Sequence, residues 1–183
     1  MAEKGVAYTE KYDLDTKDKL IIGALFENGR YSIADLSKKT GIRRDSALYR
    51  LKKLQKEKVI LGFRPIVNCP SIGYPNIAVV LLRTQSRQTG DKKDFIDKIK
   101  HKPSIIHIAT TLGRFDYYLV ILYNQHDDLN RTLEEVRIAK PGYVLEYEML
   151  QVVDEPKFDD ILGLVLSSQT GGKVKERRKR GNQ

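Results

Sequence analysis

Hydrophobic residues before position 60 recur at the spacing of three short helices. The first helix is predicted at about Asp15–Asn28, with Asp15 as its N-cap and a glycine after it as its stop. The second begins after the N-cap Ser32 and ends at Gly41, and the third covers residues 43–58. Their apolar positions predict one shared core, made by Leu14, Ile21, Ala24, Leu25, Ile33, Leu36, Ala47, Leu48, Leu51 and Leu54.

A doubled strand–helix–strand pattern follows in residues 75–153. Pro103 and Pro141 end its two amphipathic helices. The pattern predicts an α+β fold, in which a ferredoxin-like βαββαβ sandwich with an antiparallel four-stranded sheet follows the helices. A further strand, Val59–Phe63, is predicted to leave the helical unit. The strands of the sandwich are expected at Ile77–Leu82, Ser104–Leu112, Phe115–Tyr123 and Tyr143–Val153, and its helices near Asp91–His101 and Asp127–Ala139.

Two of these strands are apolar on both faces. In Phe115–Tyr123 the odd-numbered residues point one way, while Tyr118, Val120 and Leu122 point the other way, and Ile77–Leu82 is apolar throughout. Two helices cover only one face of a sheet, and a face in contact with water would be polar. We therefore expect the second face to pack on the same face of another copy, which predicts a homodimer.

The patterns divide the chain into four parts. Residues 13–60 are predicted as a helix-turn-helix domain of winged-helix-like type, 61–74 as a hinge strand or linker, and 75–155 as an αβ-sandwich dimerisation domain, to which the family resemblance described below adds an effector-binding role. Residues 156–183 form a C-terminal extension. Its apolar stretch, Ile161–Leu166, is expected to pack against the sandwich or a neighbour. Its basic run, Lys173–Arg180, is either a disordered solvated end or an arm that binds DNA without sequence preference.

Charge is unevenly distributed along the 183 residues, whose net charge is +9. Residues 1–65 hold 15 basic and 9 acidic residues, 66–166 hold 12 and 14, and 167–183 hold 6 and 1. This asymmetry favours polyanion binding at the two ends over the alternative that basic residues only aid solubility.

Cys69 is the one cysteine, so no intramolecular disulfide or all-cysteine metal site is expected. With no signal peptide and no membrane-length apolar run, the protein is predicted to be soluble and cytoplasmic.

The third helix carries the features of a DNA-recognition helix. Ala47, Leu48, Leu51 and Leu54 anchor one face, and the opposite face is basic and hydrogen-bonding. A three-helix bundle that binds nothing would not need the five Lys and Arg residues of 50–58. The first turn is expected to contact bases and the later lysines to contact phosphates, although Arg44 leans toward the apolar stripe. The predicted DNA-binding residues are Ser32, Arg43, Arg44, Asp45, Ser46, Tyr49, Arg50, Lys52, Lys53 and Lys56.

Over residues 13–155 the chain resembles the Lrp/AsnC (feast/famine) family of transcriptional regulators. The resemblance is carried by the order and spacing of several short motifs: Leu14-Asp15-Thr-Lys-Asp18, Asn28-Gly29-Arg30, Leu36-Ser-Lys-Lys-Thr-Gly41, Leu51-Lys-Lys-Leu54, Val59-Ile60-Leu-Gly62, Ile72-Gly73-Tyr74 and Gly113-Arg-Phe-Asp116-Tyr. It implies a sequence-specific DNA-binding regulator that forms dimers, or tetramers and octamers, and an effector domain of the type called RAM. Amino acids are frequent effectors in this family. No cofactor is implied.

The resemblance places Gly113, Arg114 and Asp116 in a turn at the effector pocket. Asp116 would then accept a hydrogen bond from an effector's ammonium group. The alternative, equally open from the sequence, is a tight hairpin at Gly113 with Asp116 as a solvated residue. Two features depart from the family pattern. Glu146 and Glu148 stand where many relatives have a threonine, which favours a basic effector or none, and Arg43 replaces the usual Ser or Thr cap.

Two other functions compete with sequence-specific regulation. An architectural DNA-compacting protein would use the same basic helix with little sequence preference. The second competing function is that of an enzyme, because some Lrp-like relatives are sirohaem decarboxylases with histidines in the sandwich pocket. Of the three histidines, His101 ends a helix and His126 opens one, leaving His107 as the strand residue. No paired acid–base constellation and no metal site are visible, so catalysis is not expected.

Overall fold

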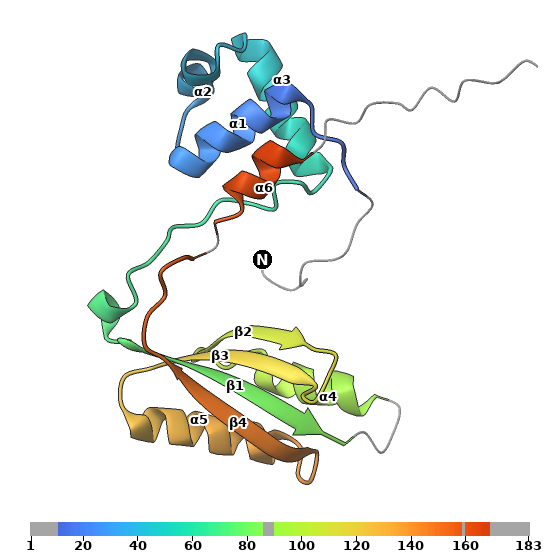
Figure 1. Cartoon of the computed structure of the whole chain (residues 1–183), viewed down its shortest axis with the longest axis vertical. Helices are drawn as coiled ribbons and strands as arrows, with labels where there is room; N and C mark the ends of the chain where they lie inside the picture. The colour runs from blue at the N-terminus through green and yellow to red at the C-terminus, as the bar shows by residue number, and fades with distance from the viewer. Residues whose placement is uncertain (1–10, 86–89, 159, 169–183) are drawn as a thin grey trace, which may run out of the picture. The chain divides into compact units, whose positions relative to one another are not determined.

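The computed structural model describes residues 11–85, 90–158 and 160–168 (Figure 1). These residues divide into two compact units. One unit holds the residues up to Pro65 together with those from Lys157 onward, and the other holds Ile66–Pro156. The basic segment Lys173–Arg180 lies outside the described residues.

Three helices form the first unit: α1 (Thr16–Glu27), α2 (Ile33–Thr40) and α3 (Arg44–Lys56). Asp15 caps α1 by accepting a hydrogen bond from the Asp18 N–H at 2.9 Å, and Asp18 returns the contact, which completes a capping box. Ser32 and Asp35 make the same reciprocal contacts at the start of α2. The helices predicted from the sequence are therefore confirmed, with their ends shifted by one or two residues.

The core of this unit lies between the three helices. Ile21, Leu36, Ala47 and Leu54 are completely buried, as the periodicity predicted. Leu48 was assigned to the core and that assignment is wrong, because 37% of its surface is exposed. A helix advances about 100° per residue, so the narrow contact made by Ala47 and Leu54 turns Leu48 toward solvent.

The chain after α3 turns sharply at Lys58, whose φ of 57° is in the left-handed region. The N–H groups of Val59 and Ile60 both donate to the Leu54 carbonyl, at 2.9 and 3.1 Å, and close the helix end. The predicted strand Val59–Phe63 is absent from the described structure. A strand needs neighbouring backbone to pair with. Here Val59 and Ile60 instead pack on the helical core.

A short helix, α6 (Leu162–Ser167), corresponds to the apolar stretch of the C-terminal extension. It belongs to the helical unit, where it contacts α1, and its Val165 packs against the core of that unit. The sequence had placed this stretch against the sandwich or a neighbour, and that expectation is wrong. Apolar content indicates that a segment packs, but it does not specify the surface that receives it.

The second unit is an antiparallel sheet with two helices, as predicted. The strands lie in the order β2-β3-β1-β4, and β1 pairs with both β3 and β4. The short 3₁₀ turn η1 (Pro70–Ile72) precedes the sheet. The elements are β1 (Asn76–Thr84), α4 (Asp91–Ile99), β2 (Ile105–Thr110), β3 (Tyr117–Tyr123), α5 (His126–Ala139) and β4 (Val144–Val152).

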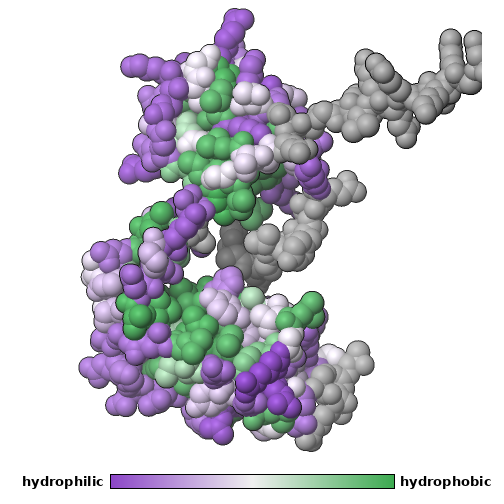
Figure 2. Space-filling view, in the orientation of Figure 1, coloured by the Kyte–Doolittle hydropathy of each residue, from purple (hydrophilic) through white to green (hydrophobic). Residues whose placement is uncertain are grey.

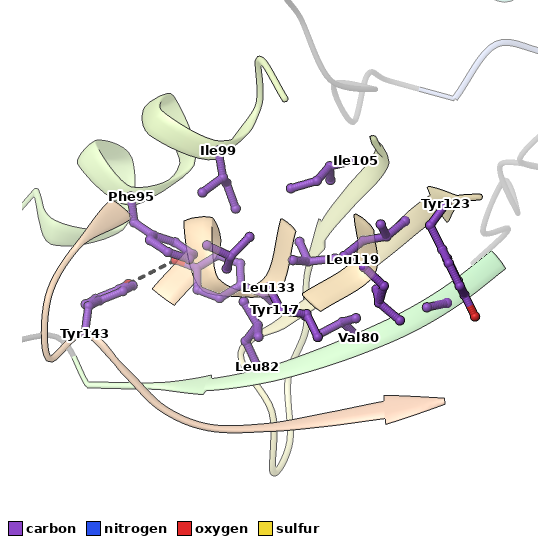
Figure 3. Close-up of a cluster of buried hydrophobic side chains, with 14 residues drawn as sticks. Val80, Leu82, Phe95, Ile99, Ile105, Tyr117, Leu119, Tyr123, Leu133 and Tyr143 are labelled. Atoms are coloured by element: carbon purple, nitrogen blue, oxygen red, sulfur yellow. Dashed lines mark hydrogen bonds between the residues drawn. The ribbon is translucent and has the colours of Figure 1, made fainter. Parts of the chain in front are cut away.

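Both helices cover the same face of this sheet (Figure 1). Figure 3 shows Phe95 of α4 and Leu133 of α5 meeting the strand residues that point toward them. The hydroxyls of Tyr117 and Tyr143 hydrogen bond to each other at 3.0 Å inside this core. Burial raises the pKa of Tyr117, and the hydrogen bond with the Tyr143 hydroxyl raises it further, so Tyr117 stays protonated.

The opposite face of the sheet carries apolar side chains without a covering layer among the described residues. Register places Val79 opposite Val120 and Leu150, and Ile77 opposite Leu122, on this open face. Figure 2 shows an apolar area over the strands of this unit. The two-faced apolar pattern seen in the sequence is confirmed. Among the described residues, no helix is both long and apolar enough to cross a membrane.

Candidate DNA-binding surface and effector turn

The turn between α2 and α3 holds α3 in a fixed direction. Gly41 adopts a φ of 71° at the end of α2, a conformation that costs a glycine little. The Ser37 hydroxyl donates to the Ile42 carbonyl and the Thr40 hydroxyl donates to the Leu36 carbonyl, each at 2.6 Å. Because Ile42 is itself buried, these bonds attach the start of α3 to the core. The geometry is that of a helix-turn-helix.

The face of α3 that points away from the core is exposed and mainly cationic. Tyr49 is the largest exposed side chain on it, with 67% of its surface accessible. Ser46 is half-buried beside it. Arg44, expected to lean toward the apolar stripe, is exposed, which corrects that expectation. The sequence-predicted residues that are exposed on or next to α3 are Arg43, Arg44, Asp45, Tyr49, Lys52, Lys53 and Lys56.

Arg43 occupies the N-cap position of α3 and makes no cap hydrogen bond with its side chain. The first N–H groups of a helix carry partial positive charge and have no partner within the helix. At α3 the two residues that open the helix, Arg43 and Arg44, are both exposed and cationic. The start of α3 therefore suits a phosphate or the acceptor edge of a base better than a neutral cap would.

The Arg50 side chain forms ion pairs with two carboxylates inside the helical unit. Its Nη1 lies 2.5 Å from Asp15 Oδ2 and 2.7 Å from Asp18 Oδ1. The Arg50 side chain is 23% exposed and that of Asp18 only 6%. Burial alone would raise the pKa of Asp15, but hydrogen bonds from Arg50 and from the Asp18 N–H outweigh burial and lower it. Arg50 thus joins α3 to α1, a structural role that the sequence, which included it among the DNA-binding residues, did not indicate.

Ser32 and Lys53 also have partners within the unit. The Ser32 hydroxyl donates to Asp35 at 2.6 Å, and its hydrogen bonds are the main cause of the lowered pKa of Asp35. The Lys53 ammonium lies 5.5 Å from the centre of the Tyr12 ring. A hydrogen bond that the Lys53 ammonium donates to the Tyr12 hydroxyl oxygen raises the pKa of Lys53. Both residues remain exposed, but each contributes to local structure.

The predicted effector turn, Gly113–Asp116, joins β2 to β3. Gly113 has a φ of 139°, which an L side chain rarely adopts. Asp116 Oδ2 accepts hydrogen bonds from the Thr84 N–H at 2.7 Å and from its hydroxyl at 3.0 Å. The Asp116 N–H also donates to the Leu82 carbonyl at 2.8 Å. Asp116 is therefore a structural residue that fixes the turn to the end of β1, and it is only half-buried.

Glu146 lies beside this turn, between two arginines. Its carboxylate is 2.7 Å from Arg114 and 3.3 Å from Arg83. The hydrogen bond from Arg114 is the main cause that lowers the pKa of Glu146. Arg114 also lies over the Phe115 ring, 5.0 Å from its centre, and remains 66% exposed. The sequence singled out Glu146 and Arg114 separately but did not show that they form a pair.

A further polar cleft, of about 600 Å³, lies between η1, the start of β2 and α5. Sequence analysis did not predict it. Its charged residues are paired, since Lys102 contacts Glu135 and Arg131 contacts Asp128.

No side chains of the described residues cluster in a way that would hold a metal ion. His107 contacts the Tyr118 ring edge-on at the open sheet face.

The comparisons with known proteins agree with this architecture. Residues 14–55 match the model of the AsnC-type helix-turn-helix domain. The chain is 31% identical over 130 residues to the proline dehydrogenase transcriptional activator of Rhizobium radiobacter, covering 71% of this chain and 83% of the relative. It is 28% identical to the leucine-responsive regulatory protein of Haemophilus influenzae, covering 82% and 90% of the two chains. This chain belongs to the Lrp/AsnC family of transcriptional regulators.

Solved structures share the fold of this Lrp/AsnC protein. Escherichia coli AsnC superposes with a TM-score of 0.72 at 22% identity, covering 82% of this chain and 99% of AsnC. A transcriptional regulator of Neisseria meningitidis, solved as a complex with L-Met, superposes with the same score of 0.72 at 20% identity, covering 79% and 93% of the two chains. The order of a helix-turn-helix followed by an α+β sandwich is confirmed.

The AsnC-type match indicates which part of this Lrp/AsnC protein binds DNA. Residues 14–55 span α1, α2 and all but the last residue of α3. Asp15, Asp18 and Arg50 fall within the match together with the exposed cations at the start of α3. The protein is accordingly a transcriptional regulator with a DNA-binding helix-turn-helix.

Proposed function

We propose that this Lrp/AsnC protein regulates transcription by sequence-specific binding to paired half-sites. The observation that carries the proposal is the start of α3, where Arg43 and Arg44 are exposed beside helix N–H groups that the Arg43 side chain does not cap. A major groove admits a helix, and arginine contacts guanine through two hydrogen bonds. Ser46 lies less than one turn further on, Tyr49 lies about one and a half turns further on, and both complete the base-facing surface. Lys52 and Lys56 would then meet phosphates.

The open face of the sheet supports a homodimer as the DNA-binding form. Its central residues, such as Val79 and Val120, pair across β1 and β3 and present apolar surface outward. A second copy of the same face is the simplest cover, since a two-fold axis brings identical patches together. Two recognition helices related by that axis would bind half-sites of a pseudo-palindrome. Such half-sites are separated by whole turns of DNA.

Alanine at Arg43 or Arg44 is expected to weaken binding to the operator by about 5- to 150-fold, which corresponds to about 1–3 kcal/mol per lost base contact. The control is Arg137→Ala, which removes an exposed arginine from α5. Footprinting upstream of the protein's own gene would locate the operator, and competition with random DNA would measure specificity. A ratio of specific to random affinity near one would contradict the proposal and favour an architectural, DNA-compacting function.

We also infer that the turn Gly113–Asp116 binds a small zwitterion such as an amino acid. The exposed Arg114 guanidinium would meet a carboxylate and Glu146 an ammonium group, while Asp116 holds the turn in place. Calorimetry with a panel of amino acids is expected to identify a ligand whose affinity falls at least tenfold in Glu146→Gln. An unchanged affinity in that variant, with binding intact, would place the effector elsewhere, for instance in the cleft beside α5.

A further inference from the structure

Asp45 is an acidic residue on the outward side of α3. It lies two residues before Ala47 and nine before Leu54, which are the completely buried residues of this helix. A helix turns by about 100° per residue, so Asp45 points about 180–200° away from both. The same spacing places three more exposed residues in one row with it, and these are Tyr49, Lys52 and Lys56. Asp45 therefore opens the row of side chains that α3 presents to its surroundings.

The Asp45 carboxylate has no hydrogen-bond or ion-pair partner among the described residues. Most carboxylates on the helices of this unit are held by a neighbour, Asp15 and Asp18 by Arg50, Glu27 by Lys39 and Asp35 by Ser32. An unpaired carboxylate on a cationic surface opposes the attraction of that surface for phosphate. The position of Asp45 is therefore not explained by affinity for the DNA backbone.

The base edges of the major groove differ in what they offer a carboxylate. An ionised carboxylate accepts hydrogen bonds and donates none. Guanine and thymine present only hydrogen-bond acceptors there, which repel a carboxylate, and adenine presents a donor beside an acceptor. Cytosine presents its N4 amino group, a donor with no acceptor beside it on the same base. An outward carboxylate in the first turn of a recognition helix thus fits cytosine better than the other three bases.

We propose that Asp45 is a specificity-determining residue, whose carboxylate accepts a hydrogen bond from a cytosine N4 amino group in each half-site. This role rests on the proposed sequence-specific DNA binding. At other sequences the same carboxylate meets phosphates and acceptor edges without a donor, and lowers the affinity. Asp45 acts through the difference in affinity between correct and incorrect sites, whereas Arg43, Arg44 and the lysines of α3 attract all DNA.

Two substitutions of Asp45 and one matched control test this role in the full-length protein. Asp45→Asn keeps the shape of the side chain and gives it the donor and acceptor that suit adenine. Asp45→Ser supplies a hydroxyl, which both donates and accepts. Glu57→Gln is the control, because it removes one carboxylate from the exposed C-cap of the same helix and changes the net charge equally.

Fluorescence anisotropy at one fixed salt concentration measures the affinity for the footprinted operator, for its single-base-pair variants and for random DNA. At one position of each half-site the wild type should bind C·G at least about fivefold more tightly than the other base pairs. Asp45→Asn should move this preference to A·T, and Asp45→Ser should lose it. Both should bind random DNA about two- to tenfold more tightly, because a repulsive charge is gone.

Glu57→Gln should keep the wild-type base preference and change the affinity for random DNA by less than about twofold. Circular dichroism checks that each variant keeps its helices, and Asp45→Ser carries the test should Asp45→Asn unfold. A folded variant of Asp45 with the wild-type preference at every position would overturn the proposal, as would a uniform gain on all DNA that Glu57→Gln reproduces. A wild type with equal affinity for the operator and for random DNA would instead reject the proposed function itself.

Discussion

Replacing Arg50 with alanine is expected to destabilise the helical unit by about 2–4 kcal/mol. Breaking a buried ion pair on one side costs about 3–5 kcal/mol, because the remaining charge stays buried and unpaired. Asp18 would be left in that state, since its side chain is 6% exposed and its Arg50 contact is 2.7 Å long. Arg50 and Asp15 are partly exposed, so water compensates part of the loss. The expected destabilisation is therefore smaller than that for a fully buried ion pair.

Chemical denaturation followed by circular dichroism measures this change. Lys52→Ala is the matched control, because it removes an exposed cation from the same helix and should alter the unfolding free energy by less than about 0.5 kcal/mol. Asp18→Asn together with Arg50→Ala should cost less than the two separate losses, since both remove one interaction. If Arg50→Ala kept the wild-type stability but lost operator binding, Arg50 would instead be a DNA-binding residue.

The ion pair of Arg50 with Asp15 should also make the stability of the fold depend on pH. Burial raises the pKa of Asp15, but hydrogen bonds from Arg50 and from the Asp18 N–H, together with the charge of Arg50, outweigh burial and lower that pKa in the folded protein. A carboxyl whose folded pKa lies below its unfolded value stabilises the fold fully above the unfolded pKa of about 3.9, and the contribution is lost as pH falls through the folded pKa. Acid unfolding of the wild type should therefore be steeper below about pH 4 than that of Arg50→Ala.

Local signals account for the parts of the fold that the sequence predicted well. Asp15 and Ser32 each supply a cap whose partner is three residues away, and Gly41 supplies the left-handed turn between α2 and α3. The two-residue alternation of β3 revealed an open apolar face. In each case the deciding interaction lies within one element, so spacing along the chain was sufficient.

The features that the sequence did not reveal depend on contacts between distant segments. Arg50 meets Asp15 from 35 residues away, and Asp116 meets Thr84 from 32 residues away. A helical pattern gives the direction of such a side chain but not what lies opposite it. The missing strand at Val59–Phe63 has the same cause, since no other strand of the described chain pairs with it. The docking of α6 on α1 belongs to this class as well.

The second large effect is expected on the open face of the sheet. Val120→Asp should convert a dimeric wild type into a monomer at micromolar concentration and weaken operator binding at least about 100-fold. Val120 pairs with Val79 on β1 and with His107 on β2, which places it within the face and away from its edges. A buried, unpaired carboxylate opposes association of two such faces. Losing simultaneous contact with two half-sites removes an avidity of about 10²–10⁴.

Ile138→Asp is the matched control, because it makes the same kind of change at a 60% exposed position of α5, on the helical layer of the same unit. It should leave mass and DNA affinity unchanged. Light scattering would measure mass, and circular dichroism would show that Val120→Asp keeps its fold, since Val120 points away from the core of that unit. A wild type that is monomeric at every concentration would reject the dimer. A Val120→Asp protein that stays dimeric would instead place the interface on another surface, and the apolar area over the strands would then need a different partner.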